Sequence, residues 1–170
     1  MSLTDADRRL IAAWAADCAE RSLPIFEDRA PADGRPGAAI AGAHAYGRGT
    51  ARVSEMRPHL RAAYAAGREV GDPAPAAAAR AAGLAAATAF IHFDETTLGT
   101  LGHIVGPAAY AALARERATP DERDLVEREI GWAIASVPPE VRAIVRRLPA
   151  PEPRGRLGRL MARIDAGIRG

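Results

Sequence analysis

Lysine is absent from the 170 residues, so every cationic side chain other than histidine is an arginine. This absence excludes lysine-dependent Schiff-base chemistry and the lysine of a phosphate-binding loop. Cysteine occurs once, at Cys18, which excludes an intramolecular disulfide and a zinc site built from cysteines. Because Cys18 follows Ile11 and Trp14 at helical spacing, we expect a small buried side chain rather than a reactive thiol.

Long apolar segments are also missing. No stretch reaches the roughly 20 apolar residues that cross a bilayer, and even the alanine-rich run at 74–90 contains Arg80. Acids and arginines interrupt residues 5–9, which do not have the order of a secretory signal. These absences predict a soluble cytoplasmic protein with no membrane partner, whose mature form begins near Met1. The length predicts one domain over residues 1–150, with a basic segment at 151–170 packed on it.

Apolar residues recur at helical spacing along the whole chain. Alanine is the commonest residue, whereas β-branched and aromatic side chains are scattered singly and form no alternating pattern. The sequence therefore predicts an all-α protein, a single compact bundle of about seven or eight helices. Small side chains cover nearly every face of the alanine-rich run, so we expect it to form a buried helix at the centre of the bundle.

The first helix has a recognisable beginning and end. Thr4, with Asp7 three residues later, is the pattern of an N-cap, and Pro24 interrupts the helix. The helical spacing predicts a buried stripe made of Leu10, Ile11, Trp14 and Cys18.

The stretch "FIHFDETTLGTLGHIVG", residues 90–106, holds two of the four histidines and two adjacent acids. If it is one helix, His92, Glu95 and His103 share a glycine-lined side opposite an apolar side. His92 and His103 would then be about 16 Å apart along the axis, too far to bind one ion, whereas His92 and Glu95 are one turn apart. Further ligands for that pair would have to come from other segments, for example His44 or His59 with Asp17 or Glu20.

The same stretch also allows a helix break, with Asp94 as the N-cap of a second helix and Thr97 at its third position. The carboxylates would then lie at a helix N-terminus, where they are favoured electrostatically and are less available for chemistry. Three interpretations stay open: a metal site, a metal-free pocket for a ligand or partner, and a polar helix contact with no functional role.

The charge is distributed unevenly. Residues 140–170 contain eight arginines and three acids, whereas the preceding residues contain fifteen arginines and eighteen acids. Such a basic segment could contact nucleic acid, an acidic partner or the acidic remainder of the chain. No aromatic residue lies among these arginines to stack on bases, which argues against nucleic acid.

Two stretches carry a family resemblance: "LIAAWAADCAERSLPIFE" near the start, and "AAARAAGLAAATAFIHFDETTLGTLGHIVGPAAYAALARE" in the middle. Together they resemble bacterial immunity proteins with the type-five-like immunity domain, over residues 4–116. The resemblance implies an all-α protein that binds a cognate toxin and blocks it. The sequence departs from the family at Leu84, where many members have a histidine after the glycine that is here Gly83.

The sequence therefore predicts a non-enzymatic binding protein with a toxin as its partner and no cofactor or metal; a homo-oligomer is also compatible with it. One alternative is a helical enzyme that uses His92, Glu95 and His103 as a metal or acid–base group. Another is a nucleic-acid-associated protein that uses the basic C-terminal segment. The candidate binding residues are Trp14, Glu20, Arg21, His92, Asp94, Glu95 and His103.

Overall fold

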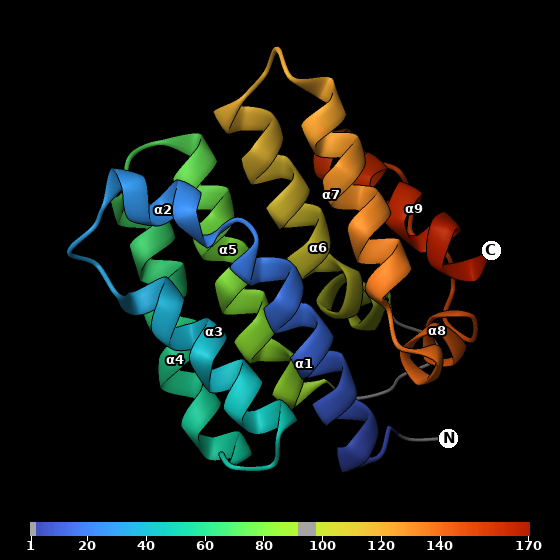
Figure 1. Cartoon of the computed structure of the whole chain (residues 1–170). Helices are drawn as coiled ribbons and strands as arrows, with labels where there is room; N and C mark the ends of the chain where they lie inside the picture. Colours follow the sequence, from blue (N-terminus) through green and yellow to red (C-terminus); the bar gives the residue numbers. More distant parts are fainter. Residues whose placement is uncertain (1–2, 92–97) are drawn as a thin grey trace.

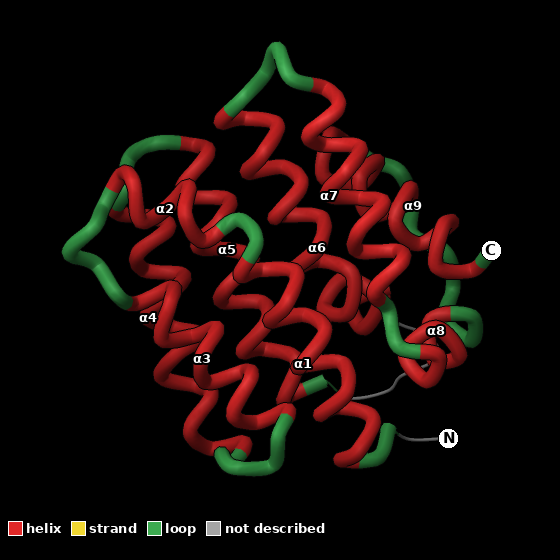
Figure 2. Tube along the Cα trace, viewed as in Figure 1, coloured by secondary structure: helices red, strands yellow, loops and turns green. Residues whose placement is uncertain are grey.

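The computed structural model describes residues 3–91 and 98–170, and within these ranges every regular element is a helix (Figure 2). The prediction of an all-α bundle is confirmed, and the expected seven or eight helices are close to the nine α-helices in the described ranges. In the same ranges, no helix combines the length and the apolar character that crossing a membrane requires. The helices are α1 (Asp5–Glu20), α2 (Leu23–Arg29), α3 (Arg35–Gly47), α4 (Val53–Glu69), α5 (Pro73–Ala87), α6 (Leu98–Ala118), α7 (Arg123–Ser136), α8 (Pro139–Val145) and α9 (Gly155–Arg169), with a short 3₁₀ helix, η1 (Thr88–Phe90), after α5.

The alanine-rich helix α5 lies at the centre of the bundle, as predicted. It packs against α1, α2, α3, α4 and α6 (Figure 1), and most of its alanines are buried. Side chains this small let neighbouring helices approach the α5 backbone on several sides at once. At Gly83, an added Cβ would lie only 2.4 Å from two ring carbons of Tyr64 on α4. An alanine at this position would therefore displace the Tyr64 ring where α4 packs on α5.

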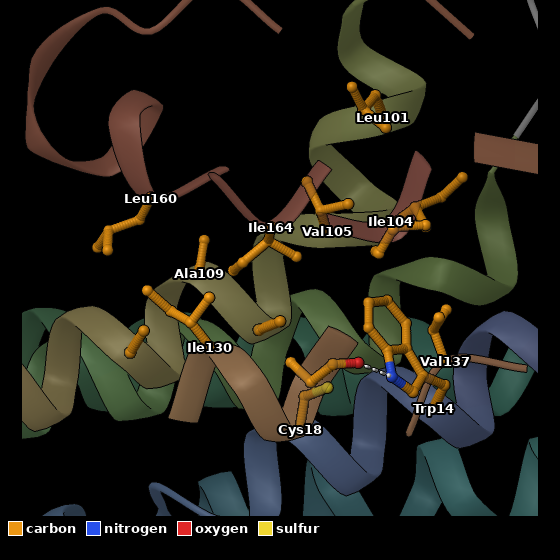
Figure 3. Close-up of a cluster of buried hydrophobic side chains, with 14 of the residues drawn as sticks. Trp14, Cys18, Leu101, Ile104, Val105, Ala109, Ile130, Val137, Leu160 and Ile164 are labelled. Carbon is orange, nitrogen blue, oxygen red and sulfur yellow. Dashed lines mark hydrogen bonds between the residues drawn. The ribbon is translucent and has the colours of Figure 1, made fainter. Parts of the chain in front are cut away.

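Helices α6 to α9 form the other half of the bundle (Figure 1). A short turn joins α6 to α7, and α9 packs against both of them, while α8 contacts α1 and α9. Larger apolar side chains fill this half (Figure 3), and on α9 the side chains of Leu160, Ile164 and Ile168 are fully buried. The basic C-terminal segment thus contributes a helix that docks on its own chain.

The predicted start of α1 is confirmed. The Thr4 hydroxyl accepts a hydrogen bond from the backbone N–H of Asp7 at 3.1 Å, and the Asp7 carboxylate accepts one from the backbone N–H of Thr4 at 2.8 Å. Of the predicted buried stripe, Leu10 is wrong, because it is 37% exposed. Leu10 lies two turns before the exposed Asp17, on the side of α1 that faces solvent.

Candidate functional site

The segment that contains residues 90–106 is not one continuous helix. Ile91 has an extended backbone, with φ −62° and ψ 122°, and α6 begins at Leu98. His92, Asp94 and Glu95 lie outside the described residues, as does the predicted N-cap at Asp94. Within α6 the expected two-sided pattern is present, because Leu101 is fully buried whereas His103 is exposed.

His103 lines a pocket of about 370 Å³ between α4 and the region where α5 gives way to α6. The Arg57 guanidinium lies at this pocket, 4.8 Å from the centroid of the Phe90 ring. Nδ1 of His103 is 2.7 Å from the carbonyl oxygen of Gly99, a distance at which the ring nitrogen donates a hydrogen bond. The other described lining residues are Leu60, Ala87, Ile91 and Thr100.

The chemistry of this pocket favours binding. Its described walls are mainly apolar, with a guanidinium and an imidazole at the edge, a combination that holds a small ligand or a partner side chain. Because Nδ1 of His103 is engaged by Gly99, Nε2 is the ring nitrogen left for a ligand. Among the described lining residues, His103 is the single side chain of a type that commonly ligates metals.

Glu20, another candidate from the sequence, belongs to a second cluster. Asp17 and Glu20 lie one turn apart on α1, and His44 faces them from α3. His44 Nε2 is 3.7 Å from Asp17 Oδ1 and 3.7 Å from Glu20 Oε2. Burial raises the pKa of Asp17, His44 opposes this rise, and the neighbouring Glu20 charge adds to it. The structure thus brings together three side chains that were named from the sequence but were not expected to form a cluster of their own.

Close packing of α1 on α3 fixes this arrangement. A Cβ added at Gly47 would lie 3.0 Å from the Cβ of Ala13 and 3.2 Å from its backbone nitrogen. Because the two backbones approach so closely, His44, one turn before Gly47, is held beside the next turns of α1. His59, the other histidine considered from the sequence, packs instead against Gly42.

Arg21 is engaged within the chain. Its guanidinium donates to both carboxylate oxygens of Glu129 on α7, at 2.7 and 3.3 Å, and lies 4.4 Å from the Trp132 ring centroid. Arg115 on α6 approaches the same carboxylate to 3.6 Å and donates to the Arg21 carbonyl oxygen at 3.1 Å. These contacts tie the end of α1 to α6 and α7, so Arg21 has few donors left for another molecule.

Trp14 lies in the core, with 2% of its surface exposed (Figure 3). Its indole N–H donates to the carbonyl oxygen of Ala133 at 3.3 Å and to Oγ of Ser136 at 3.2 Å. Both acceptors belong to α7. In this position Trp14 holds α1 against α7 and presents no surface to a partner.

A comparison with protein families matches residues 1–140 to the family described as Imm-5 like putative immunity protein. The chain belongs to this family. The match is longer than the resemblance seen in the sequence, which covered residues 4–116, and it ends at the start of α8. No curated protein and no solved structure matches the chain.

Arg57 and Leu60 were not predicted as site residues of this Imm-5 like chain. Both belong to α4, and the sequence has no signal that places α4 beside residues 99–103. Leu84, at which the resemblance suggested a departure from the family pattern, has a packing role. Its side chain lies where a Cβ on Gly106 would come within 2.9 Å, at the contact between α5 and α6.

Proposed function

We propose that this chain is a non-enzymatic immunity protein that neutralises a bacterial toxin by binding to it. The observation that carries the proposal is the family match over residues 1–140, which includes both candidate sites. Binding alone is enough for this function, and no reacting group is needed. We further propose that the protein acts in the cytoplasm, as a monomer or as a homo-oligomer.

The exposed surface supports a polar interface. Among the described large apolar side chains, Leu10 is the one with more than about a third of its surface in contact with solvent. An interface on such a surface relies mainly on charged groups and hydrogen bonds at its rim, so its association rate depends on salt. The residues before 140 contain eighteen acids and fifteen arginines and are mildly acidic, whereas the whole chain has a net charge of +2, so the overall charge does not select a basic partner.

We propose that the pocket beside His103 receives a side chain of the toxin. It offers an apolar wall, an aromatic ring under a guanidinium, and an imidazole within one small area, and such anchor pockets contribute most to many interfaces. We also propose His92, Asp94 and Glu95 as binding residues, on the basis of the sequence alone, because they lie near His103 in the chain.

The basic C-terminal segment gives less support to nucleic-acid binding than its charge suggests. At least six of its eight arginines interact within the chain. Two of them tie α9 to the helices beneath it: Arg156 pairs with Glu116 on α6, and Arg163 pairs with Glu127 on α7. We therefore propose that this segment is part of the folded domain.

Co-expression tests the proposed function. The full chain would be expressed with each toxin domain encoded in the same genome, and growth would be measured together with the mass of any complex on size-exclusion chromatography. We expect growth to be restored for one toxin and a stable complex to form with it. If no toxin is neutralised by well-expressed, folded protein, the proposal fails.

A charge reversal at the pocket locates the interface. Arg57→Glu removes the guanidinium from the pocket edge, and we expect binding to weaken by at least about tenfold, as for an anchor residue. Arg61→Glu is the matched control, because Arg61 is also exposed, lies one turn further along α4 and does not line the pocket. Equal effects of the two reversals would place the interface elsewhere.

The pocket volume also favours a second candidate function, binding of a small ligand, because about 370 Å³ lies within the range of ligand sites. A screen of metabolites by thermal unfolding tests it. Stabilisation by one compound should be lost in Leu60→Trp, which fills the pocket. If stabilisation persists in that variant, the compound binds outside the pocket.

A further inference from the structure

Three side chains of types that bind metal ions converge between α1 and α3. The ligand atoms of Asp17, Glu20 and His44 all lie within 4.8 Å of one another. His44 Nε2 is 3.7 Å from each of the two carboxylate oxygens, beyond hydrogen-bonding distance. Two donors on one tetrahedral zinc ion are about 3.4 Å apart, so each carboxylate would move about 0.3 Å closer to His44, and the two carboxylates up to about 1.4 Å closer to each other, to share one ion.

We propose that Asp17, Glu20 and His44 form a binding site for a divalent transition-metal ion, with zinc as the best match. One imidazole nitrogen and two carboxylate oxygens are a mixed donor set that zinc accepts readily and that manganese and ferrous iron also tolerate. Calcium and magnesium prefer sites built from oxygen alone, so they match less well.

The local charge supports a cation at this point. Asp17 and Glu20 repel each other, and in the described part of the chain no arginine forms an ion pair with either, although the protein has 23 arginines. Among the described residues, His44 is the basic group within ion-pair distance of both carboxylates, and it carries at most one positive charge. By contrast, Asp5 at the start of α1 pairs with Arg9 at 2.7 Å. A divalent ion would neutralise both carboxylates of the cluster.

The scaffold also suits a metal site. The His44 side chain is only 22% exposed, held between two helices whose backbones meet at Gly47. Ligands mounted on rigid helices lose little conformational freedom when an ion binds. The carboxylates of Asp17 and Glu20 are 53% and 63% exposed, so the site opens to solvent. Three protein ligands on a four-coordinate ion leave one position for water or for a group from another molecule.

Isothermal titration tests this site without any toxin. Zinc chloride would be titrated into the full-length, untagged protein in a buffer free of chelators. We expect one zinc ion per chain to bind at the cluster. His44→Ala and Asp17→Asn should each weaken zinc binding by at least about tenfold, because mutating even an outer-sphere partner of a metal lowers its affinity by about 10–100-fold. His59→Ala and Glu27→Gln are the controls: an imidazole packed on Gly42 and an exposed acid on α2.

A second measurement guards against folding defects. Zinc should raise the melting temperature of the natural protein and of both controls, and should raise it less in His44→Ala and Asp17→Asn, with circular dichroism confirming that every variant is helical. The proposal is overturned if zinc gives no binding heat, or if His44→Ala binds zinc as tightly as the natural protein. Tighter binding of magnesium than of zinc would also contradict it. Since the assay uses this chain alone, its failure leaves the proposed immunity function untouched.

Discussion

Replacing Gly83 by alanine should destabilise the protein, although the same change usually stabilises a helix. In a helix interior, alanine is about 1 kcal/mol more favourable than glycine. At Gly83, however, the added Cβ would lie 2.4 Å from both Cδ1 and Cε1 of Tyr64, whereas carbon atoms in contact are normally about 3.5 Å apart or more. Because α5 is enclosed by five helices, its backbone cannot retreat, so the Tyr64 ring has to move.

The size of the effect follows from two opposing contributions. Overpacking of this kind costs about 1–3 kcal/mol, and the helix preference of alanine returns about 1 kcal/mol. Movement of the ring also disturbs its contact with the Arg80 guanidinium, which lies 4.8 Å from the ring centroid. We expect a net loss of up to about 2 kcal/mol in the free energy of unfolding, measured by urea titration with circular dichroism.

Two comparisons make this prediction refutable. Gly131→Ala on α7 adds a Cβ with nothing within 4 Å, so it should stabilise by about 0.5–1 kcal/mol. In a Tyr64→Ala background the overlap disappears, so Gly83→Ala should then stabilise as well. If Gly83→Ala stabilises the natural protein, or still destabilises it without the Tyr64 ring, the packing argument is wrong.

Three further predictions concern the core. Trp14→Phe removes a buried hydrogen-bond donor and leaves a small cavity, so the free energy of unfolding should fall by about 1–3 kcal/mol in a urea titration, and an unchanged value would contradict the described burial. Burial raises the pKa of the Cys18 thiol, so Ellman's reagent at neutral pH should label it only after unfolding; immediate labelling would count against this. Ile164→Ala should lower the free energy of unfolding by about 2–5 kcal/mol, and the variant should still unfold in a single transition. A separate early transition would show that α9 is not part of the domain.

For the fold, the predictions that rested on the spacing of residues within one helix were accurate. Thr4 and Asp7 form the expected cap, and Ile11 and Cys18 are buried at the expected spacing. Leu10 was wrong because it lies at the edge of the apolar stripe, where only the position of the neighbouring helices decides burial.

The candidate sites were less predictable, since they depend on contacts between distant segments. Glu20 and His44 were identified in the sequence, yet their proximity depends on how closely α1 packs on α3 at Gly47. Arg57 carried no local signal at all. Its pocket forms only because α4 and the start of α6 both lie beside the end of α5.

The sequence by itself determined the helical class, the buried central alanine helix and the membership suggested by residues 4–116, because helical periodicity and family likeness are both present in the linear order of residues. Only the tertiary structure decided which side chains meet. In the folded chain, Arg21 and most of the C-terminal arginines form contacts with other residues of the same chain. Asp17 and Glu20, by contrast, face a histidine and, within the described ranges, no arginine. The physical reason is that a charge is available to a partner or an ion only where packing leaves it without a neighbour of opposite sign, and packing depends on the whole bundle.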